Sequence, residues 1–246
     1  MKLPGRVAVI TGAGGYLGSG IALRLAEEGA HIMVIDKDLI EAGKTVNQIT
    51  ALGGQAIAHG ADVTKTAQVI EMIEQVIKEW GKVDVLVNNA GGPRDAALVK
   101  MTDEDWDAVV DLNLKGSFIC ARAVAPYMIE RRYGRIVNIS STAHTGKNVG
   151  QANYASAKAG VVGLTGALGS ELARYGITVN CVAPGLIDTP KTRGFSKKVV
   201  DTIIEGIPMR RMGEIVDVAN AVLFLATDEA KFITRQVIHV SGGVVG

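Results

Sequence analysis

The feature that most constrains the fold of this chain is a regular alternation between apolar runs and longer segments with helical spacing. The apolar runs are rich in β-branched residues and lack a helical period, which is typical of strands buried on both faces. They cover residues 6–11, 31–36, 55–63, 82–91, 135–140, 177–185 and 236–243. Helical segments between them predict parallel strands joined by right-handed crossovers. No linker interrupts the pattern, so residues 1–246 are predicted to form one doubly wound α/β domain.

The composition fits a protein with a large core and points to no nucleic-acid or membrane partner. Hydrophobic residues make up 48% of the 246 residues, and the formal net charge is +1. Basic residues form no stripe, and the N-terminal apolar run is too short for a signal sequence or a membrane span. Cys120 and Cys181 lie in apolar segments, so we interpret them as free thiols rather than a disulfide. We therefore predict a cytoplasmic protein without a metal site.

Three glycines, Gly12, Gly15 and Gly18, separate the first predicted strand from the helical segment that ends at Gly29. Glycine permits a tight turn there and lets backbone amides approach a pyrophosphate, whose charge a helix N-terminus favours. A glycine-rich turn alone is a weak signal. Its position between a strand and a helix predicts that the turn binds a dinucleotide.

Asp36 ends the second predicted strand and bears on which dinucleotide binds. A carboxylate there can accept hydrogen bonds from both adenosine ribose hydroxyls and repels a 2′-phosphate, so NAD is favoured over NADP. Lys37 weakens this preference, because its cation could bind the 2′-phosphate of NADP. Asp36 could instead cap the next helix. Asp62, after the third strand, is placed to bond the adenine amino group or, alternatively, to form a plain turn.

Tyr154 and Lys158 stand four residues apart in an Ala-rich segment of helical character, so their side chains project from one face. A free phenol has a pKa near ~10, and a fixed ammonium one turn away would stabilise its phenolate. Such a pair can act as a general acid and base at neutral pH. A hydroxyl from Ser140 or Ser141 could hold a substrate oxygen against the phenol. The alternative is a helix surface where Tyr and Lys coincide by chance.

Taken together, these segments resemble the short-chain dehydrogenase/reductases over nearly the whole chain. The matching motifs are TGAGGYLG, DV at 62–63, NNAG at 88–91, Asn113 within DLNLKGSF, Ser141, YASAK at 154–158 and PG at 184–185, in the family's order and spacing. The resemblance implies a Rossmann fold with strand order 3-2-1-4-5-6-7 and the compact, single-domain branch. It also implies an oxidoreductase that transfers a hydride between NAD(H) and a secondary alcohol or ketone.

The resemblance implies a role for each site residue. The catalytic residues would be Asn113, Ser141, Tyr154 and Lys158. Tyr154 would be the general acid/base and Ser141 would steady the substrate oxygen, while Lys158 binds the nicotinamide ribose and lowers the tyrosine pKa. Asn113 would hold a water of a proton relay. The implied cofactor site comprises Gly12, Gly15, Tyr16, Leu17, Gly18, Asp36, Asp62, Val63, Asn89, Ala90, Gly91, Tyr154, Lys158, Pro184, Gly185, Ile187 and Thr189.

One position departs from the compact branch. That branch usually has TGxxxGxG, whereas this chain has Tyr16 where a glycine is expected and a glycine at 15. The spacing is similar to the extended branch, but the chain is too short for that branch's second domain. Tyr16 is therefore expected to affect only the local packing over the cofactor phosphates.

The family sets its substrate in the loop after Gly92, in the loop between Ser141 and Tyr154, and in a lid around residues 189–208. His144 and Gln151, with Ser141 and Tyr154, are the candidate substrate residues, although His144 could equally pack the loop. GGPRDAALVKMTDEDWD and GQANYASAKAG are similar to 3-oxoacyl-carrier-protein reductases. The alternative function is therefore an NAD(P)H-dependent reductase of 3-oxoacyl thioesters of coenzyme A or a carrier protein.

Basic residues could recognise such a thioester. Arg132 matches a position that docks the acidic carrier, but the second docking arginine falls at Tyr175, with Arg174 one place early. Lys191, Arg193, Lys197 and Lys198 could meet a phosphate or could form a solvated lid surface.

The family resemblance also implies a homotetramer that pairs the helices at 103–131 and 152–175 and the C-terminal strand. A catalytically silent NAD-binding regulator is the other class considered. Such proteins usually lose the Tyr or the Lys, and this chain keeps both.

Overall fold

Seven parallel strands form one sheet in the order β3-β2-β1-β4-β5-β6-β7, which confirms the predicted topology. The structure is a computed structural model and describes residues 1–194 and 196–244. The strands are β1 (Val7–Thr11), β2 (His31–Asp36), β3 (Gln55–Gly60), β4 (Val85–Asn88), β5 (Gly134–Ile139), β6 (Ile177–Pro184) and β7 (Val237–Val240). The order reverses direction between β1 and β4, which is where a doubly wound sheet binds its ligands.

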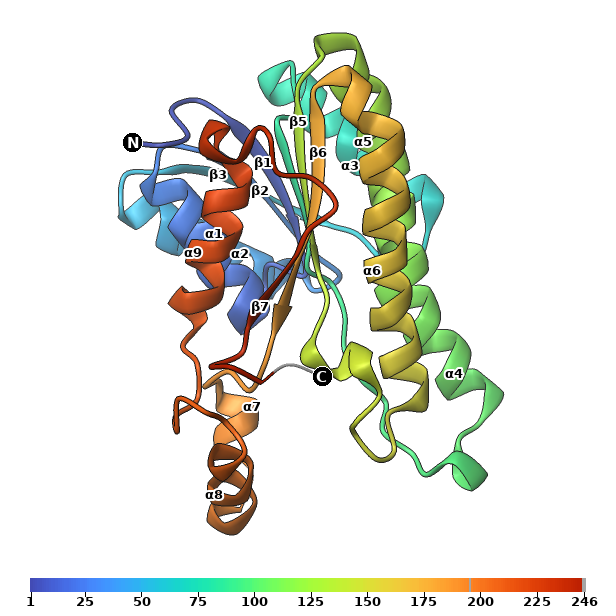
Figure 1. Cartoon of the computed structure of the whole chain (residues 1–246). Helices are drawn as coiled ribbons and strands as arrows, with labels where there is room; N and C mark the ends of the chain where they lie inside the picture. Colours follow the sequence, from blue (N-terminus) through green and yellow to red (C-terminus); the bar gives the residue numbers. More distant parts are fainter. Residues whose placement is uncertain (195, 245–246) are drawn as a thin grey trace.

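Helices cover both faces of the sheet (Figure 1). They are α1 (Tyr16–Glu27), α2 (Leu39–Ala51), α3 (Thr66–Trp80), α4 (Asp103–Val110), α5 (Gly116–Arg131), α6 (Ala152–Leu172), α7 (Pro190–Arg193), α8 (Lys197–Glu205) and α9 (Ile215–Ala226). Helices α1, α2 and α9 share one hydrophobic core with the sheet, and α3, α5 and α6 share the other. Along β1, Ala8 and Ile10 enter the first core while Val7 and Val9 enter the second, so the strand is apolar throughout.

Polar residues end two strands earlier than predicted, and β7 also covers only Val237–Val240 of the predicted 236–243. β3 stops at Gly60, since Asp62 turns the chain by accepting a hydrogen bond from the backbone N–H of Thr64 at 2.9 Å. β4 covers only Val85–Asn88, since Asn89 bonds the turn after β1 instead of continuing the ladder. Asp84, just before β4, is buried among three cationic side chains.

The long helical region predicted from Thr102 to Arg132 is interrupted in the middle. Asp111–Lys115 forms a π turn between α4 and α5, and Asn113 is the buried residue within it. Insertions of this kind occur often at functional sites. The turn redirects α5 and places the Asn113 side chain toward the loop after β4.

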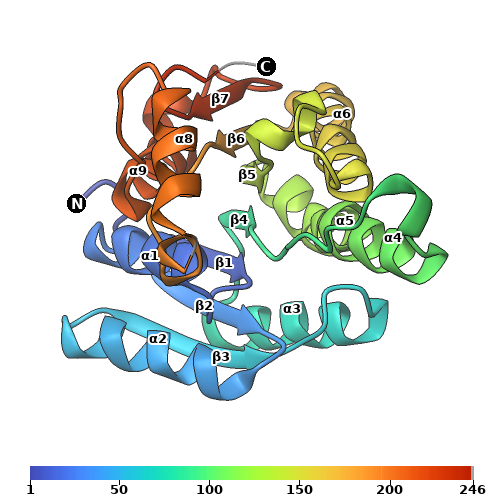
Figure 2. The same ribbon diagram turned by 90° about the horizontal axis from the view of Figure 1, so that it is seen from below.

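The carboxyl ends of the strands gather at one end of the molecule. Figure 2 looks onto this end, where α8 and α4 lie on opposite sides with β4 and β5 between them. Helices α7 and α8 project from the body there, within the segment predicted as a lid. None of the helices in the described residues combines the length and apolar character that crossing a membrane requires.

Candidate active site

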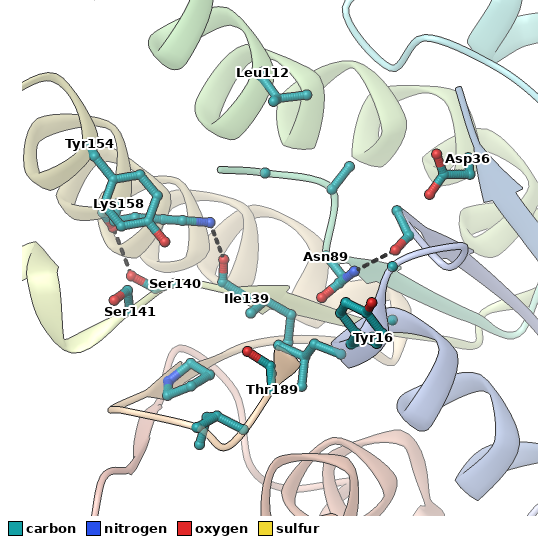
Figure 3. Close-up of a pocket in the computed structure, with 18 of the residues that line it drawn as sticks. Tyr16, Asp36, Asn89, Leu112, Ile139, Ser140, Ser141, Tyr154, Lys158 and Thr189 are labelled. Atoms are coloured by element: carbon teal, nitrogen blue, oxygen red, sulfur yellow. Dashed lines mark hydrogen bonds between the residues drawn. The ribbon is translucent and has the colours of Figure 1, made fainter. Parts of the chain in front are cut away.

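A cavity of about 620 Å³ opens at the carboxyl ends of the strands (Figure 3). Its lining includes every residue predicted for the cofactor, namely Gly12, Gly15, Tyr16, Leu17, Gly18, Asp36, Asp62, Val63, Asn89, Ala90, Gly91, Tyr154, Lys158, Pro184, Gly185, Ile187 and Thr189. Sequence reasoning missed Ala61, Leu112, Ile139, Leu186 and Thr192, which also line it. Of the predicted site residues, all within the described chain, Asn113, His144 and Gln151 do not line the cavity.

The turn between β1 and α1 packs so closely on the loop after β4 that only glycine fits. Gly12 has a φ of +64°, and a Cβ there would lie 2.8 Å from the Cα of Ala90. A Cβ at Gly18 would overlap the Gly12 oxygen and the Asn89 amide. The Asn89 amide bridges the two segments by donating to the carbonyls of Thr11 at 2.9 Å and Gly12 at 3.1 Å. No side chain caps α1 at Gly15, so its first amides are available to an anion.

The Asp36 carboxylate lies at the end of β2 and faces the same cavity. One of its oxygens accepts a hydrogen bond from the backbone N–H of Gly14 at 3.0 Å, and the other accepts from that of Asp38 at 3.1 Å. The cap of α2 is Asp38, whose side chain accepts from the N–H groups of Ile40 and Glu41. The alternative of Asp36 as the helix cap is therefore wrong.

Asp62 forms the turn that ended β3 and also lines the cavity, so both of its predicted roles are compatible with the structure. One carboxylate oxygen accepts from the Thr64 N–H at 2.9 Å and from its hydroxyl at 2.8 Å. Burial raises the pKa of Asp62, but these hydrogen bonds and two nearby lysines outweigh it, and the pKa ends below its usual value. Asp62 is thus a fixed anion at the cavity wall.

Tyr154 and Lys158 project side by side from α6, above the serines that follow β5 (Figure 3). Lys158 is 3% exposed, and its ammonium donates to the Ile139 carbonyl at 2.8 Å. The Ser140 hydroxyl is buried and donates to the Lys158 carbonyl at 3.0 Å, so it braces α6 against β5. Ser141, which is only half-buried, is the serine left to face a substrate oxygen.

The protein groups by themselves raise the pKa of Tyr154, whereas the sequence led us to expect a lowered value. Burial is the main cause, interaction with the Ser141 hydroxyl opposes it, and the charge of Asp95 adds to it. The Lys158 nitrogen lies 5.6 Å from the centre of the tyrosine ring. Burial also lowers the pKa of Lys158 from 10.5 to about 8. Desolvation is therefore the largest cause of both pKa shifts.

Asn113 anchors the loop after β4 to the π turn. Its amide donates to the carbonyls of Val109 at 2.8 Å and Gly92 at 3.0 Å, and its oxygen accepts from the Gly92 N–H at 3.2 Å. A Cβ at Gly91 would overlap this oxygen and lie 3.2 Å from the Lys158 nitrogen. Asn113 therefore lies close to Lys158, and its role in a water relay stays a prediction.

His144 and Gln151 flank the cavity. The Nδ1 of His144 lies 2.6 Å from the Ser141 carbonyl, and its ring packs against His239 with centroids 5.3 Å apart. These contacts favour the loop-packing interpretation of His144. Gln151 is the first residue before α6, and its amide donates to the carboxylate of Asp95.

Several of the basic residues proposed for thioester recognition are engaged within the chain. Arg132 donates to the Arg174 carbonyl at 2.9 Å. Arg193 pairs with Asp188 at 2.8 Å and Lys197 with Asp201 at 2.6 Å, which favours the solvated-surface interpretation for both. The side chain of Lys191 lies outside the described residues.

Comparisons with known proteins place this geometry in a family. Residues 12–245 match the family model described as enoyl-(acyl carrier protein) reductase. A (2S)-[(R)-hydroxy(phenyl)methyl]succinyl-CoA dehydrogenase subunit of Thauera aromatica is 46% identical, over 99% of this chain and 98% of its own. A 3-oxoacyl-[acyl-carrier-protein] reductase of Staphylococcus epidermidis is 48% identical, over 96% of this chain and 98% of its own.

The chain is a short-chain dehydrogenase/reductase. A solved structure assigned as a short-chain alcohol dehydrogenase of Sinorhizobium meliloti superposes with a TM-score of 0.94 at 34% identity, over 98% of this chain and 97% of its own. As a short-chain dehydrogenase/reductase, the protein is an oxidoreductase that uses a nicotinamide cofactor and acts on alcohol or carbonyl groups. The predicted family and reaction class are confirmed.

Proposed function

We propose that this enzyme interconverts 3-hydroxyacyl and 3-oxoacyl thioesters with NAD(H) as the cofactor. Two relatives support the substrate class, because each covers nearly the whole chain and is named for an acyl thioester with an alcohol or ketone. In both names the alcohol or ketone is on the carbon β to the thioester carbonyl. The same names favour chemistry at a C–O bond over reduction of a C=C bond. A simple secondary alcohol or ketone remains the second candidate substrate.

The Asp36 carboxylate is the observation that supports NAD. It lines the cavity at the end of β2, and backbone N–H groups hold both of its oxygens in place. A fixed anion there suits the two ribose hydroxyls of NAD and repels the 2′-phosphate of NADP. Lys37 also lines the cavity, but a single exposed cation beside a fixed carboxylate offsets only part of that repulsion.

The residues of the cavity fit a dinucleotide along its whole length. The glycine turn and the uncapped N-terminus of α1 suit the pyrophosphate, and Asp36 and Asp62 suit the adenosine. Lys158, Gly185, Ile187 and Thr189 are assigned to the nicotinamide end. Bound there, the nicotinamide supplies the hydride exchange with the carbinol carbon.

Side chains of the protein donate and accept the proton that accompanies the hydride. In reduction, the Tyr154 hydroxyl donates its proton to the carbonyl oxygen as the hydride reaches the carbon, and the Ser141 hydroxyl donates a hydrogen bond to the same oxygen. In oxidation, the Tyr154 phenolate accepts the alcohol proton. Lys158, fixed to Ile139, keeps its positive charge close to the ring in both directions. The family role of Asn113 in returning the proton to solvent completes the proposed relay.

The cofactor and substrate are tested together with purified enzyme. We expect kcat/KM with acetoacetyl-CoA to be at least about tenfold higher with NADH than with NADPH, and acetoacetyl-CoA to exceed a plain ketone of similar size. Asp36→Ala should reduce the NADH preference, whereas the cap variant Asp38→Ala should leave it unchanged. A preference for NADPH in the unaltered enzyme would overturn the cofactor assignment, and equal use of the plain ketone would overturn the thioester.

We further propose that the enzyme assembles as a homotetramer through α4, α5 and α6. Trp106 on α4 and Phe118 on α5 are 39% and 40% exposed, and Gly163 and Gly166 on α6 face open space. Such small residues permit close helix contacts, and the exposed aromatic rings would gain from burial. Light scattering should give about four times the mass of the chain, and Phe118→Asp should lower it.

We also propose that residues 189–208 form a lid over the substrate site of this single-domain enzyme. Helix α8 is joined to the body through α7, and its apolar residues Val199 and Ile203 are 47% and 37% exposed one turn apart. If this lid closes over the site, the acyl chain of a bound substrate could contact both side chains. Helix α8 should therefore become protected from hydrogen exchange when a long-chain 3-oxoacyl-CoA is added.

A further inference from the structure

Besides Asp36 and Asp62, a third carboxylate lies close to the site without lining the cavity, and sequence reasoning missed it. Asp95 is an exposed residue in the loop after β4. The Gln151 amide nitrogen donates to both of its oxygens, at 3.1 and 3.3 Å. The orientation of that amide is set by Asn148, which donates to the Gln151 oxygen at 2.8 Å. Asp95 is therefore held in one position by a side chain at the start of α6.

The backbone around Asp95 is fixed to the same turn of α6 that bears Tyr154. The Ala96 N–H donates to the Gly150 carbonyl at 2.9 Å. Asn153 is fully buried and donates to the Arg94 carbonyl at 2.9 Å, while its oxygen accepts from the Tyr154 N–H at 2.7 Å. Residues at the start of α6 thus hold both Asp95 and Tyr154.

The charge of Asp95 reaches the reacting end of Tyr154. Burial is the main cause of the raised tyrosine pKa and the Ser141 hydroxyl opposes it, while the charge of Asp95 adds to it. The other groups facing the phenol are Lys158 below the ring and Ser141 after β5, with His144 behind the Ser141 carbonyl. A substrate carbonyl bound between Ser141 and Tyr154 would therefore lie within the field of this carboxylate.

We propose that Asp95 is a specificity-determining residue that disfavours substrates with a second negative charge near the reacting carbonyl. The inference rests on the proposed thioester chemistry and narrows it to 3-oxoacyl chains that are neutral beyond the carbonyl. At an assumed separation of about 7 Å, with both groups partly in solvent, Coulomb repulsion from Asp95 would disfavour a substrate carboxylate about fourfold. The preferred class then differs from the succinyl-CoA derivative named for the Thauera relative, which carries a free carboxylate.

A matched pair of substrates tests this directly. The two are 3-oxohexanoyl-CoA and 3-oxohexanedioyl-CoA, which differ only in a terminal methyl or carboxylate. The unaltered enzyme should have a kcat/KM about fourfold higher for the neutral substrate, mainly through KM, and the ratio should shrink as salt is raised. Asp95→Asn should bring the ratio to about one by improving the acidic substrate. Glu104→Gln removes an exposed carboxylate from α4 and should leave the ratio unchanged.

The pH profile gives a second readout that a purely structural role would not change. In the oxidation of 3-hydroxyhexanoyl-CoA, the rate rises with pH as Tyr154 loses its proton. Asp95→Asn should move this rise to lower pH, because the anion that opposes phenolate formation is gone. Asp95→Glu keeps the charge and should keep the profile of the unaltered enzyme. Circular dichroism establishes that each variant is folded.

The outcomes separate this inference from the proposed function. Reduction of neither thioester with NADH or NADPH would overturn the proposed function itself. Reduction of both thioesters with an unchanged ratio in Asp95→Asn would overturn only the role of Asp95. Equal loss of activity toward both substrates in folded Asp95→Asn would also overturn it, because that result indicates a general positioning role.

Discussion

The ammonium of Lys158 lies 2.8 Å from the main-chain oxygen of Ile139, so α6 is hydrogen-bonded to the last residue of β5. Ser140, the next residue along, returns a hydrogen bond to the Lys158 carbonyl at 3.0 Å. These reciprocal bonds fix α6 against the strand that leads to Ser141. The distance between the tyrosine hydroxyl and the serine hydroxyl is therefore set by backbone groups on both sides.

Removal of the tyrosine hydroxyl should abolish turnover and spare cofactor binding. Tyr154→Phe is expected to lower kcat by about 10²–10⁴, since it deletes the proton donor and leaves the ring in place. Steady-state kinetics and a fluorescence titration with NADH measure the two effects. Tyr175→Phe removes a hydroxyl far from the cavity and serves as the control. Retained turnover in Tyr154→Phe would instead support a protein whose function is cofactor binding.

Lys158 is expected to reduce stability while supporting catalysis. Burial lowers its pKa from 10.5 to about 8, so the unfolded chain binds more protons than the folded one between these values. Stability should therefore rise with pH from about 8 to 10.5, and the cost of burying the charge is fully present below pH 8. Lys158→Met should then stabilise the protein by up to about 3 kcal/mol at pH 7 while losing activity.

Urea unfolding at several pH values measures this effect. The pH dependence between 8 and 10.5 should be weaker in Lys158→Met than in the unaltered protein. Lys147→Met, at an exposed position, should change neither the stability nor its pH dependence. A Lys158→Met protein less stable at pH 7 would show that the bond to Ile139 outweighs the cost of burial.

The glycine turn should tolerate no side chain at Gly18. A Cβ there overlaps the Gly12 oxygen and the Asn89 amide, so Gly18→Ala must separate the turn from the loop after β4. We expect at least about a tenfold loss of NADH affinity by calorimetry. Gly43→Ala in α2 meets no atom within 4 Å and should stabilise the protein by about 0.5–1 kcal/mol. Unchanged affinity in Gly18→Ala would contradict the assignment of the pyrophosphate to this turn.

Removal of the buried Asp84 carboxylate should strongly lower the free energy of unfolding. Its carboxylate is fully buried, accepts from the Val7 N–H at 2.9 Å, and pairs with Arg131 at 2.9 Å and Lys82 at 3.2 Å. Asp84→Ala leaves these donors without their acceptor and is expected to cost about 3–5 kcal/mol in chemical denaturation. Asp111→Ala breaks an exposed pair with Lys115 and should cost less than about 0.5 kcal/mol.

The strand pattern and the sheet-edge motifs were readable in the sequence because they follow from side-chain type. β-Branched runs such as Val7–Thr11 have to be buried on both faces, and their alternation with helices defines the sheet. Residues such as Asp36 and Ser141 follow strands directly, so their place at the carboxyl edge follows from the topology. The cavity gathers them as expected.

What the sequence did not reveal depends on backbone groups and distant pairs. The acceptor for Lys158 is a main-chain carbonyl, which leaves no side-chain signature at Ile139. Asp95 and Gln151 are 56 positions apart, and their contact exists only in the folded chain. The expectation of a lowered Tyr154 pKa took into account only the attraction between the phenolate and Lys158. Burial instead determines the direction of both pKa shifts.

The π turn at Asp111–Lys115 makes this stretch sensitive to its own length. Each residue added to a helix, or removed from it, rotates everything that follows by about 100°. Deletion of one residue here would turn Asn113 away from Gly92 and would also turn the apolar side of α5 away from β4 and β5. A substitution in this turn changes one side chain, whereas a change of length would displace both the loop after β4 and the hydrophobic core at once.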